Sequence, residues 1–400
     1  MKTESTLEME QGTDTYHVDR VEMDKISPDL LLQWSALLKR NGSESPMHDP
    51  QWLSECFCDK PRDVSVYFLY RGELLAGFAP FVTTQWPVKL QLGEITLARL
   101  PLNRLRLLGG SAHFPEDPAA YTMLFREVAA REGNFDALYL DDAAVDSFLW
   151  RFLESSPIID GLFSRYQPEA PAPRVLLRLN GSFDDYMGTF SSKHRQTLRR
   201  KARKFQDVAP GETRCIRCTT PEEVDGFLEK AAAISEKTYQ QKLLGGGVRV
   251  DEKTRAHHSY LARHGWMRSY LLVSKDTPCA FVTGYQYGSR YYLDDMGYDP
   301  AWRDYSVGTV LQLGIIEDLF GYDPPAIYDL GEYGPHKEEF ATDNYLQGKL
   351  FLFRRGVYTH FVRTGHKACN ASTEAVSGLL ERFGWKAWLK KTIRMWSSRS

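Results

Sequence analysis

The segment from residue 290 to residue 340 gathers the residues whose types and spacing could carry chemistry. Arg303, Ser306 and Gly308 stand in a short loop just before a predicted helix. The first turn of a helix leaves N–H groups unpaired and carries a partial positive charge, so an anion such as a pyrophosphate can bind there. Glycine would let the backbone approach closely, and the arginine would add a full charge. We therefore predict an anion-binding loop with these contact residues: Arg303, Ser306, Val307, Gly308 and Thr309.

Two adjacent carboxylates, Asp294 and Asp295, lie in the strand predicted just before this loop. Alternation along a strand places one of them on each face of the sheet. A carboxylate within hydrogen-bond reach of an amine can act as its general base, directly or through water. Asp295 is the slightly preferred candidate for that catalytic role. A purely structural or substrate-orienting carboxylate fits the sequence equally well.

A second polar group follows the next predicted strand. Glu332 and Tyr333 come directly after that strand, and His336 and Lys337 follow within four residues. We expect Glu332, His336 and Lys337 to contact the substrate, because the lysine suits an anionic group and the histidine titrates near neutrality. Tyr333 could donate a proton to a leaving group. The plainer alternatives are a packed tyrosine and surface His and Lys side chains.

Hydrophobic patterning predicts a mixed α/β chain around these residues. Strands are expected at 64–70, 74–82, 137–140, 174–179, 268–273, 280–287, 290–296, 327–330 and 349–355. Helices are expected at 28–39, 118–131, 145–153, from Ser182, at 191–204 and 220–244, from Asp251 to about His264, at 307–320 and at 335–340. The candidate loop therefore lies between a strand and a helix.

Proline marks the main domain boundary. The stretch YQPEAPAPR at 166–174 holds three prolines and no apolar periodicity, which is typical of a stiff linker. We expect a disordered tail at 1–15, a first domain at 16–165 and a second at 175–365. A softer boundary near 365–372 precedes a basic amphipathic helix predicted at 372–398.

Composition excludes several classes of protein. The 400 residues include 50 Lys and Arg against 52 Asp and Glu, so the chain is not a globally basic nucleic-acid binder. An apolar content of 42% is enough for real cores, and no apolar run is long enough to span a membrane. The six cysteines lack the paired spacing of a zinc site, so no metal is expected. The polar N-terminus has no apolar signal core, which indicates a cytoplasmic protein.

Two basic helices suggest polyanionic partners. The helix at 191–204 contains seven Lys and Arg and no acid, but it lacks interleaved aromatic residues, so nucleic acid is not favoured. A solvated basic face is the alternative. The C-terminal helix mixes Lys and Arg with Trp385, Trp388 and Trp396, which suits an anionic membrane surface. Docking of its apolar stripe on the protein body is the competing interpretation.

Four features, in this order, resemble the GNAT acyltransferase superfamily and, within it, the CelD-like acetyltransferases related to the FemABX peptidyltransferases. They are the basic helix at 191–204, YDPAWRDYSVG at 298–308, YDLGEYG at 328–334 and Lys337. Ser306 replaces a glycine that is usual in the family's phosphate loop, and His336 replaces a usual tyrosine. The resemblance covers about 175–360 well and 16–165 loosely.

The resemblance implies an α/β fold of tandem GNAT-like domains, each a mixed, mostly antiparallel sheet flanked by helices. It implies an N-acyltransferase that uses acetyl-CoA or another acyl-CoA, with an amino sugar or polysaccharide precursor as the amine. Only the second domain has the phosphate-loop spacing, so we expect only this copy to bind the acyl carrier. Two alternatives remain: a FemABX-like transferase that uses aminoacyl-tRNA on a cell-wall precursor, and a non-catalytic assembly factor of polysaccharide synthesis.

Overall fold

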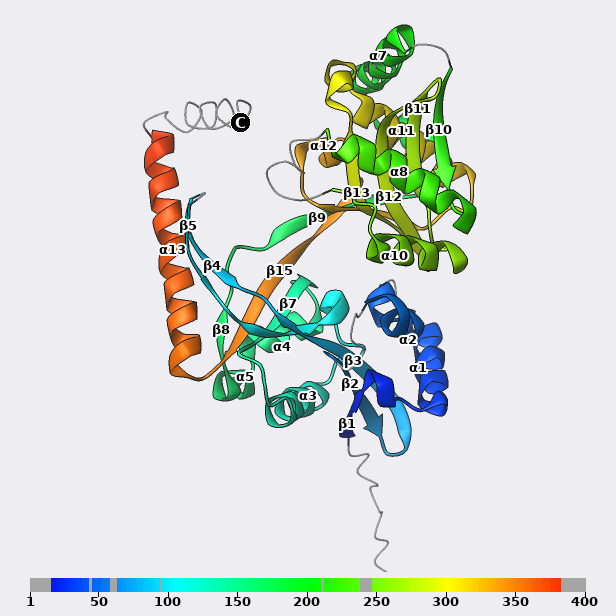
Figure 1. Cartoon of the computed structure of the whole chain (residues 1–400). Coiled ribbons are helices and arrows are strands. Elements are labelled where there is room, and N and C mark those ends of the chain that lie inside the picture. The colour runs from blue at the N-terminus through cyan, green and yellow to red at the C-terminus, as the bar shows by residue number, and fades with distance from the viewer. Residues whose placement is uncertain are drawn as a thin grey trace, which may run out of the picture. The chain divides into compact units, whose positions relative to one another are not determined.

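The computed structural model divides the chain into two compact units (Figure 1). It describes residues 16–42, 45–57, 63–93, 95–209, 212–237 and 247–382. The first unit contains residues 1–40, 58–171 and 347–400, and the second contains 41–57 and 172–346.

The sheet of the first unit is antiparallel except for one parallel pair. Its strands follow the order β1 (Tyr16–Glu22), β2 (Val64–Arg71), β3 (Leu74–Gln85), β6 (Asn103–Leu107), β7 (Ala137–Ala144) and β15 (Asp343–Arg354), and β8 (Phe163–Tyr166) also pairs with β15. Strands β6 and β7 form the parallel pair. A separate hairpin consists of β4 (Val88–Leu92) and β5 (Ile95–Leu100).

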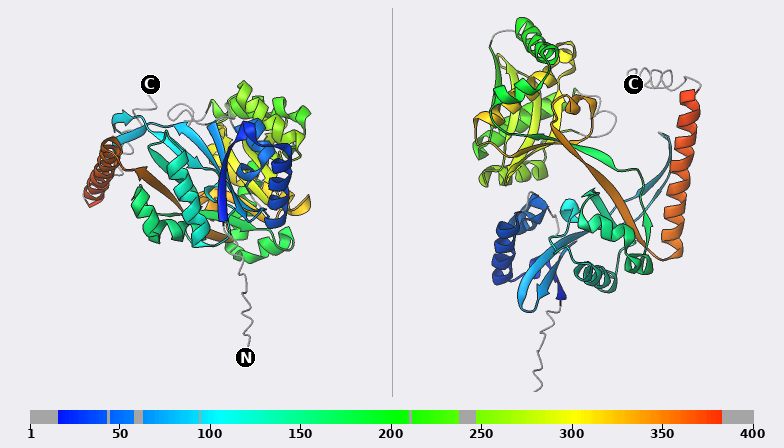
Figure 2. Two further views of the ribbon diagram at one scale, coloured as in Figure 1. Left: turned by 90° about the horizontal axis from the view of Figure 1, so that it is seen from below. Right: turned by 180° about the vertical axis from the view of Figure 1, so that it is seen from behind.

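Helices cover both faces of this sheet. Trp34 of α1 (Pro28–Asn41) is fully buried against Phe68 and Phe78 on one face. The other face packs on α3 (Pro118–Arg131), α4 (Phe148–Ser155) and α5 (Pro157–Leu162) around an apolar core. The last helix, α13 (Val357–Arg382), lies along β4, as both Figure 1 and the right-hand view of Figure 2 show.

The second unit repeats the same strand order. Its sheet runs β10 (Thr213–Cys218), β11 (Ser269–Ser274), β12 (Thr277–Tyr287), β13 (Arg290–Tyr298), β14 (Ile327–Glu332) and β9 (Ala172–Arg178), and β13 and β14 form its one parallel pair. In both units a helix joins the two parallel strands: α3 in the first and α11 (Val307–Gly321) in the second. This repetition within one chain defines a tandem fold.

Two layers of helices enclose the second sheet. On one face α6 (Phe183–Thr189), α7 (Ser192–Val208) and α11 bury an apolar core that includes Tyr291 and Tyr328. On the other face α8 (Val224–Ser235) packs on β12 and β13, and α10 (Glu252–Arg263) packs on α8. The short α12 (Pro335–Glu338) follows β14.

The unit boundaries differ from the predicted domains in three places. The break at Pro171 falls inside the predicted proline-rich linker. The last break, by contrast, falls at Leu346 rather than at 365, because the second half of β15 pairs with β7 and β8. Residues 41–57, with α2 (Pro50–Trp52), belong to the second unit, where Tyr287 donates to Asp49 and Trp52 meets His257 edge-on. The helix α13 continues through the softer boundary at 365–372, and 383–398 lies outside the described residues.

Candidate active site

The parallel strands β13 and β14 separate after three residue pairs. Pairing begins at Arg290 with Ile327 and ends at Tyr292 with Asp329, although β13 continues to Tyr298 and β14 to Glu332. Backbone N–H and C=O groups beyond this point therefore have no partner across the β13–β14 gap. An extended ligand can pair with β13 here, so we treat this opening as the centre of the site.

A β-bulge on β13 corrects the predicted positions of the two carboxylates. Thr283 pairs with Asp295 while Gly284 pairs with Leu293, so Asp294 is the extra residue. A bulge shifts the alternation of side chains by one position. Asp295 therefore lies on the same face as its partner Thr283, and the Thr283 hydroxyl lies 3.5 Å from Asp294 Oδ2. The prediction of one carboxylate on each face was wrong.

Asp295 is the more buried of the two carboxylates. Burial raises its pKa, the Met296 N–H that donates to Asp295 Oδ1 at 2.8 Å opposes the shift, and the neighbouring charge of Asp294 adds to it. A carboxylate with a raised pKa is a stronger base than an ordinary aspartate. Asp294 is exposed. The geometry thus keeps Asp295 as a candidate base and places Asp294 beside it.

The N-terminus of α11 has no side-chain cap. Ser306 occupies the cap position with φ 55° and ψ 36°, and its side chain makes no capping hydrogen bond. The first N–H groups of α11 therefore remain available to an anion. Gly308 faces open space, because a Cβ built there meets no atom within 4 Å, and Arg303 is exposed. The Val307 side chain is buried in the core, so only its backbone can contact a ligand.

The corresponding helix of the first unit is closed to anions. The Asp117 carboxylate caps α3 by accepting from Ala119 N–H at 2.8 Å. A carboxylate at this position both occupies N–H groups and repels a second anion. The difference between Asp117 and Ser306 supports the prediction that only the second unit holds the acyl carrier.

The basic helix α7 adjoins the loop. Lys204 Nζ donates to the Asp304 carbonyl at 2.8 Å and lies over the Tyr305 ring, and Phe205 packs edge-on against Trp302. Lys201 pairs with Glu339 at 3.0 Å. Four further cations of this helix are exposed: Lys193, Arg199, Arg200 and Arg203. Positive charge thus extends from α11 along α7.

A buried ion cluster, which the sequence did not indicate, lies at the point where β13 and β14 separate. The side chain of Asp329 is fully buried, and its carboxylate pairs with Arg174 at 2.8 Å and Arg290 at 3.2 Å. Asp329 also accepts from Gly331 N–H at 2.9 Å. These contacts fix the start of the segment that carries Glu332, Tyr333 and Lys337.

Lys337 reaches this cluster. Its Nζ lies 3.4 Å from the position of a Cβ built on Gly331, whose φ is +83°. Burial lowers the pKa of Lys337, the charge of Arg174 lowers it further, and Glu332 and Asp329 oppose the shift. A half-buried ammonium close to the charge of Arg174 suits an anionic group of a substrate.

Tyr333 and His336 lie on the outer side of this segment. Tyr333 is 48% exposed and donates to Glu338 Oε2 at 2.7 Å, so the packed-core interpretation was wrong. That hydrogen bond raises the pKa of Tyr333. His336 is exposed, and partial desolvation and Lys337 lower its pKa. The structure shows no contact of Tyr333 or His336 with Asp294 or Asp295.

Two histidines of α10 face the bulge and were missed by the sequence argument. Burial lowers the pKa of both His257 and His258, and the Asp294 carboxylate opposes that shift in both. His258 Nδ1 bonds to the Thr254 carbonyl at 2.9 Å, and His257 meets Trp52 edge-on. Only the tertiary packing of α10 brings these residues to β13, so no local sequence signal marks them.

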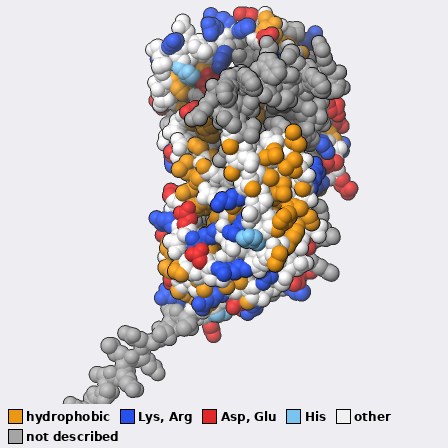
Figure 3. Space-filling model, turned by 90° about the vertical axis from the view of Figure 1, so that its left-hand side faces the viewer, with side chains coloured by type: hydrophobic (Ala, Val, Ile, Leu, Met, Phe, Trp, Pro, Cys, Tyr) orange, Lys and Arg blue, Asp and Glu red, His pale blue; other side chains and the backbone are white. Residues whose placement is uncertain are grey.

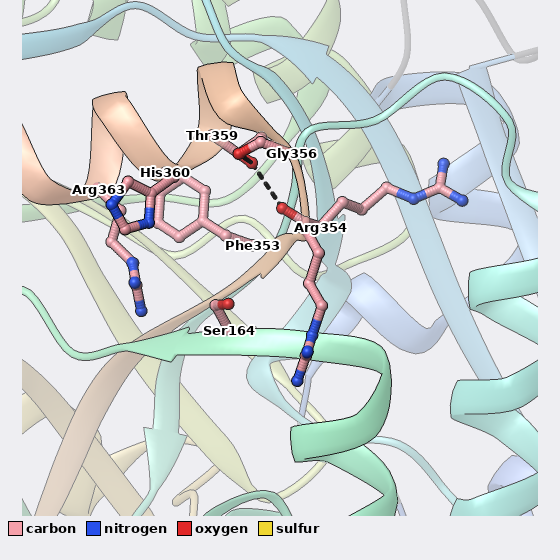
Figure 4. A pocket seen from close by; sticks show the side chains of 8 residues that line it. Ser164, Phe353, Arg354, Gly356, Thr359, His360 and Arg363 are labelled. Carbon is pink, nitrogen blue, oxygen red and sulfur yellow. Dashed lines mark hydrogen bonds between the residues drawn. The ribbon is translucent and has the colours of Figure 1, made fainter.

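Other features of the described chain do not form a second reaction centre. A cavity of about 300 Å³ in the first unit is lined by Arg354, Arg355, His360 and Arg363 (Figure 4). No cluster of three metal-ligating side chains occurs in the described residues. Cys215, Cys218, Cys279 and Cys369 are free thiols, and the Cys56 and Cys58 side chains lie outside the description. Among described helices, none has the length and apolarity to cross a bilayer.

Comparison with known proteins agrees with this geometry. Residues 192–340 match the family model of the acetyltransferase (GNAT) domain. The crystal structure of FemX aligns over 84% of this chain and 97% of its own, with a TM-score of 0.54 and 12% identity. A conserved protein of unknown function from Bacteroides thetaiotaomicron aligns over 84% of this chain and all of its own, with a TM-score of 0.50 and 11% identity. No curated protein matches the sequence.

The second unit therefore carries a GNAT acetyltransferase domain, and the protein is an acyltransferase by class. The two structural likenesses establish the fold alone, and both span the two units. The expected tandem GNAT-like architecture is confirmed, together with its mixed, mostly antiparallel sheets. GNAT folds generally take acyl-CoA as co-substrate.

Proposed function

We propose that this protein transfers an acyl group, in the simplest case acetyl, from acyl-CoA to an amine. The observation that carries the proposal is the uncapped N-terminus of α11, which follows the separating strand β13 after a short 3-10 helix at Pro300–Tyr305. A pyrophosphate would bind the free N–H groups and Arg303, and the extended arm of the carrier would pair with β13. Gly308 leaves the space that this approach needs.

The chemical step is direct attack of the amine nitrogen on the thioester carbon. The new C–N bond forms while the C–S bond breaks, and the proton lost by the amine balances the proton gained by the thiolate. We assign proton acceptance to Asp295, with Asp294 next to it. Tyr333 is the predicted proton donor, and in this structure its hydroxyl donates a hydrogen bond to the Glu338 carboxylate.

The acceptor we propose is an amine that carries an anionic group, such as an amino sugar or polysaccharide precursor. Lys337, Arg174 and Arg290 converge at the separation of β13 and β14, and Asp329 compensates part of their charge. This arrangement supports recognition of a phosphate or carboxylate on the acceptor. Glu332 and His336, on the same segment, remain predicted substrate contacts.

Thermal melting with free CoA, acetyl-CoA and longer acyl-CoAs tests the donor. Ligand at 100 times its dissociation constant stabilises the folded state by about 2.7 kcal/mol, which gives a shift of several degrees. We expect a shift with acyl-CoA that Gly308→Trp removes. A shift retained in Gly308→Trp would contradict the loop assignment. The absence of a shift with every CoA would point to another donor or to a non-catalytic protein.

Aminoacyl-tRNA is the second candidate donor, and the four exposed cations of α7 support it, because they extend the positive surface beyond the loop. Nitrocellulose filter binding with charged tRNA would test this donor. Saturable tRNA binding together with no acyl-CoA shift would favour it. Some FemABX-like enzymes carry a long helical arm in the second domain. The described helices α8 and α10 of this protein have only 12 residues each, so neither forms such an arm.

A further inference from the structure

The layer formed by the β4–β5 hairpin and α13 exposes a concentration of large apolar side chains. At the hairpin turn, Leu92, Ile95 and Leu97 are 40%, 68% and 57% exposed. Seven of the fifteen large apolar side chains exposed in the described chain belong to this layer or its flank: Trp86, Leu92, Ile95, Leu97, Val357, Tyr358 and Phe361. Figure 3 shows apolar side chains gathered on this face beside Lys and Arg side chains. Such a concentration marks a binding surface.

The sequence of this layer is strongly basic although the chain as a whole is slightly acidic. Residues 86–100 and 355–400 contain eleven Lys and Arg against three Asp and Glu. The rest of the chain contains 39 Lys and Arg against 49 Asp and Glu. Residues 86–100 and 355–382, which form the hairpin and α13, contribute six of these Lys and Arg against three Asp and Glu, so this layer has a net positive charge. The partner of this surface must tolerate both positive charge and exposed apolar groups.

A basic cavity opens at the start of α13, among the exposed apolar residues. Its volume is about 300 Å³, and its charged and titratable lining residues are Arg354, Arg355, His360 and Arg363, without an acidic side chain (Figure 4). Arg354 already donates to three carbonyls at the end of α3. Arg363 has no such bond within the described structure. The cavity is large enough for a phosphate group.

Helix α13 passes the hairpin turn and continues beyond it. The Thr373 hydroxyl accepts from Gly93 N–H at 3.0 Å and donates to the Gln91 carbonyl at 3.3 Å, so α13 passes the turn at this residue. The described helix ends at Arg382, about 14 Å further along its axis. Residues 383–400 then carry five Lys and Arg, three Trp and no acid.

We propose that the β4–β5 hairpin and α13 bind the surface of an anionic lipid bilayer. Leu92, Ile95 and Leu97, around the hairpin turn, enter the boundary between head groups and acyl chains, and Lys367 of α13 contacts the head groups. The cavity beside Arg363 takes a lipid phosphate. A net positive charge beside exposed apolar residues is the combination that such a surface attracts.

Co-sedimentation of the full-length protein with vesicles tests this proposal without any assumption about acyl transfer. We expect binding to phosphatidylcholine vesicles that contain phosphatidylglycerol, no binding to phosphatidylcholine alone, and weakening by salt. Ile95→Ser with Leu97→Ser should lower the affinity about tenfold or more. The matched control, Leu32→Ser with Leu74→Ser, replaces side chains that are 70% and 77% exposed elsewhere in the same unit and should bind like the parent.

A variant that removes one positive charge tests the proposal independently of the apolar side chains. Arg363→Gln should weaken binding to anionic vesicles about fivefold, and thermal melting should show unchanged folding for every variant. Equal binding to neutral vesicles, or parental binding by the Ile95→Ser/Leu97→Ser variant, would overturn the proposal. A concentration-dependent dimer that this variant abolishes, with no vesicle binding by the parent, would identify a second copy of the chain as the occupant instead.

Discussion

Arg174 Nε lies 2.9 and 2.8 Å from the two carboxylate oxygens of Asp329, a side chain with no exposure to solvent. The two residues come from the neighbouring strands β9 and β14, which are 155 residues apart in the chain. Arg290 of β13 completes the cluster from the other side. One carboxylate thus holds three strands together where two of them begin to separate.

Removal of this carboxylate should be strongly destabilising. Asp329→Ala removes the carboxylate that pairs with two largely buried arginines. We therefore expect the free energy of unfolding to fall by about 3–5 kcal/mol. Urea denaturation followed by tryptophan fluorescence measures this. Asp343→Ala, which breaks the more exposed Arg178–Asp343 pair of the same unit, is the control and should cost less than about 1 kcal/mol. Equal losses in the two variants would contradict a structural role for Asp329.

Gly308 offers a test of ligand approach that does not disturb the fold. Gly308→Ala should leave the melting temperature nearly unchanged, because a Cβ there meets no atom within 4 Å, but it should weaken acyl-CoA binding about tenfold or more by filling the approach to the backbone. Isothermal titration measures the affinity. Gly321→Ala, at the other end of α11 and equally open, should bind like the parent. Parental affinity in Gly308→Ala would place the pyrophosphate elsewhere.

The backbone of Ser306, the N-cap residue of α11, is in a strained conformation. Its φ of 55° is a left-handed conformation that favours glycine. We expect Ser306→Gly to stabilise the protein by about 1 kcal/mol and Ser306→Val to destabilise it by at least that amount. Chemical denaturation checks both signs. A stability loss in Ser306→Gly would contradict this expectation, because it would mean that the serine side chain stabilises the folded protein.

The raised pKa of Asp295 predicts that its replacement by Asn increases stability at neutral pH, although it lowers activity if Asp295 is the base. A folded-state pKa above the unfolded value means that the ionised carboxylate destabilises the fold as pH rises above about 3.8 and through the folded pKa. Asp295→Asn should therefore melt higher than the parent at pH 7, and the difference should shrink toward pH 4. If Asp295 is the base, kcat should fall about 10²–10⁴-fold.

The same comparison with Asp294→Asn separates the two carboxylates. Asp294 is exposed, so its replacement should change the melting temperature little. Loss of activity in Asp294→Asn with near-parental activity in Asp295→Asn would transfer the role of base to Asp294. Parental activity in both variants would exclude either carboxylate as the base.

Elements with strong local signals were predicted closely from the sequence. Asp117 and Pro118 define the start of α3, and the predicted 118–131 coincides with the observed helix. Helix α11 was predicted at 307–320 and ends one residue later. Helical structure also begins at the expected Ser182 and Thr220, each with a capping box. Caps and turns act within a few residues, so a short stretch of sequence contains what decides them.

Features that depend on distant pairing were not predicted. The bulge at Asp294 arises from the register between β12 and β13, and the Arg174–Asp329 cluster requires β9 to pair with β14. The β4–β5 hairpin was not predicted, although the VKLQL of β4 alternates apolar and polar residues. Strand β15 begins at Asp343 rather than 349, with its polar first residues in the second unit. The predicted site residues were selected mainly by the family resemblance, and their roles remain predictions.

The position of strand β15 in the chain affects the order in which the two units can complete their folding during synthesis. It supplies the first unit with a strand between β7 and β8, yet it is translated after nearly the whole second unit. A chain emerging from the ribosome can therefore complete the acyltransferase domain before its first unit has all of its strands. A chain truncated between residues 346 and 354 would have a complete second unit and an open sheet edge in the first unit, and such an edge recruits chaperones or aggregates.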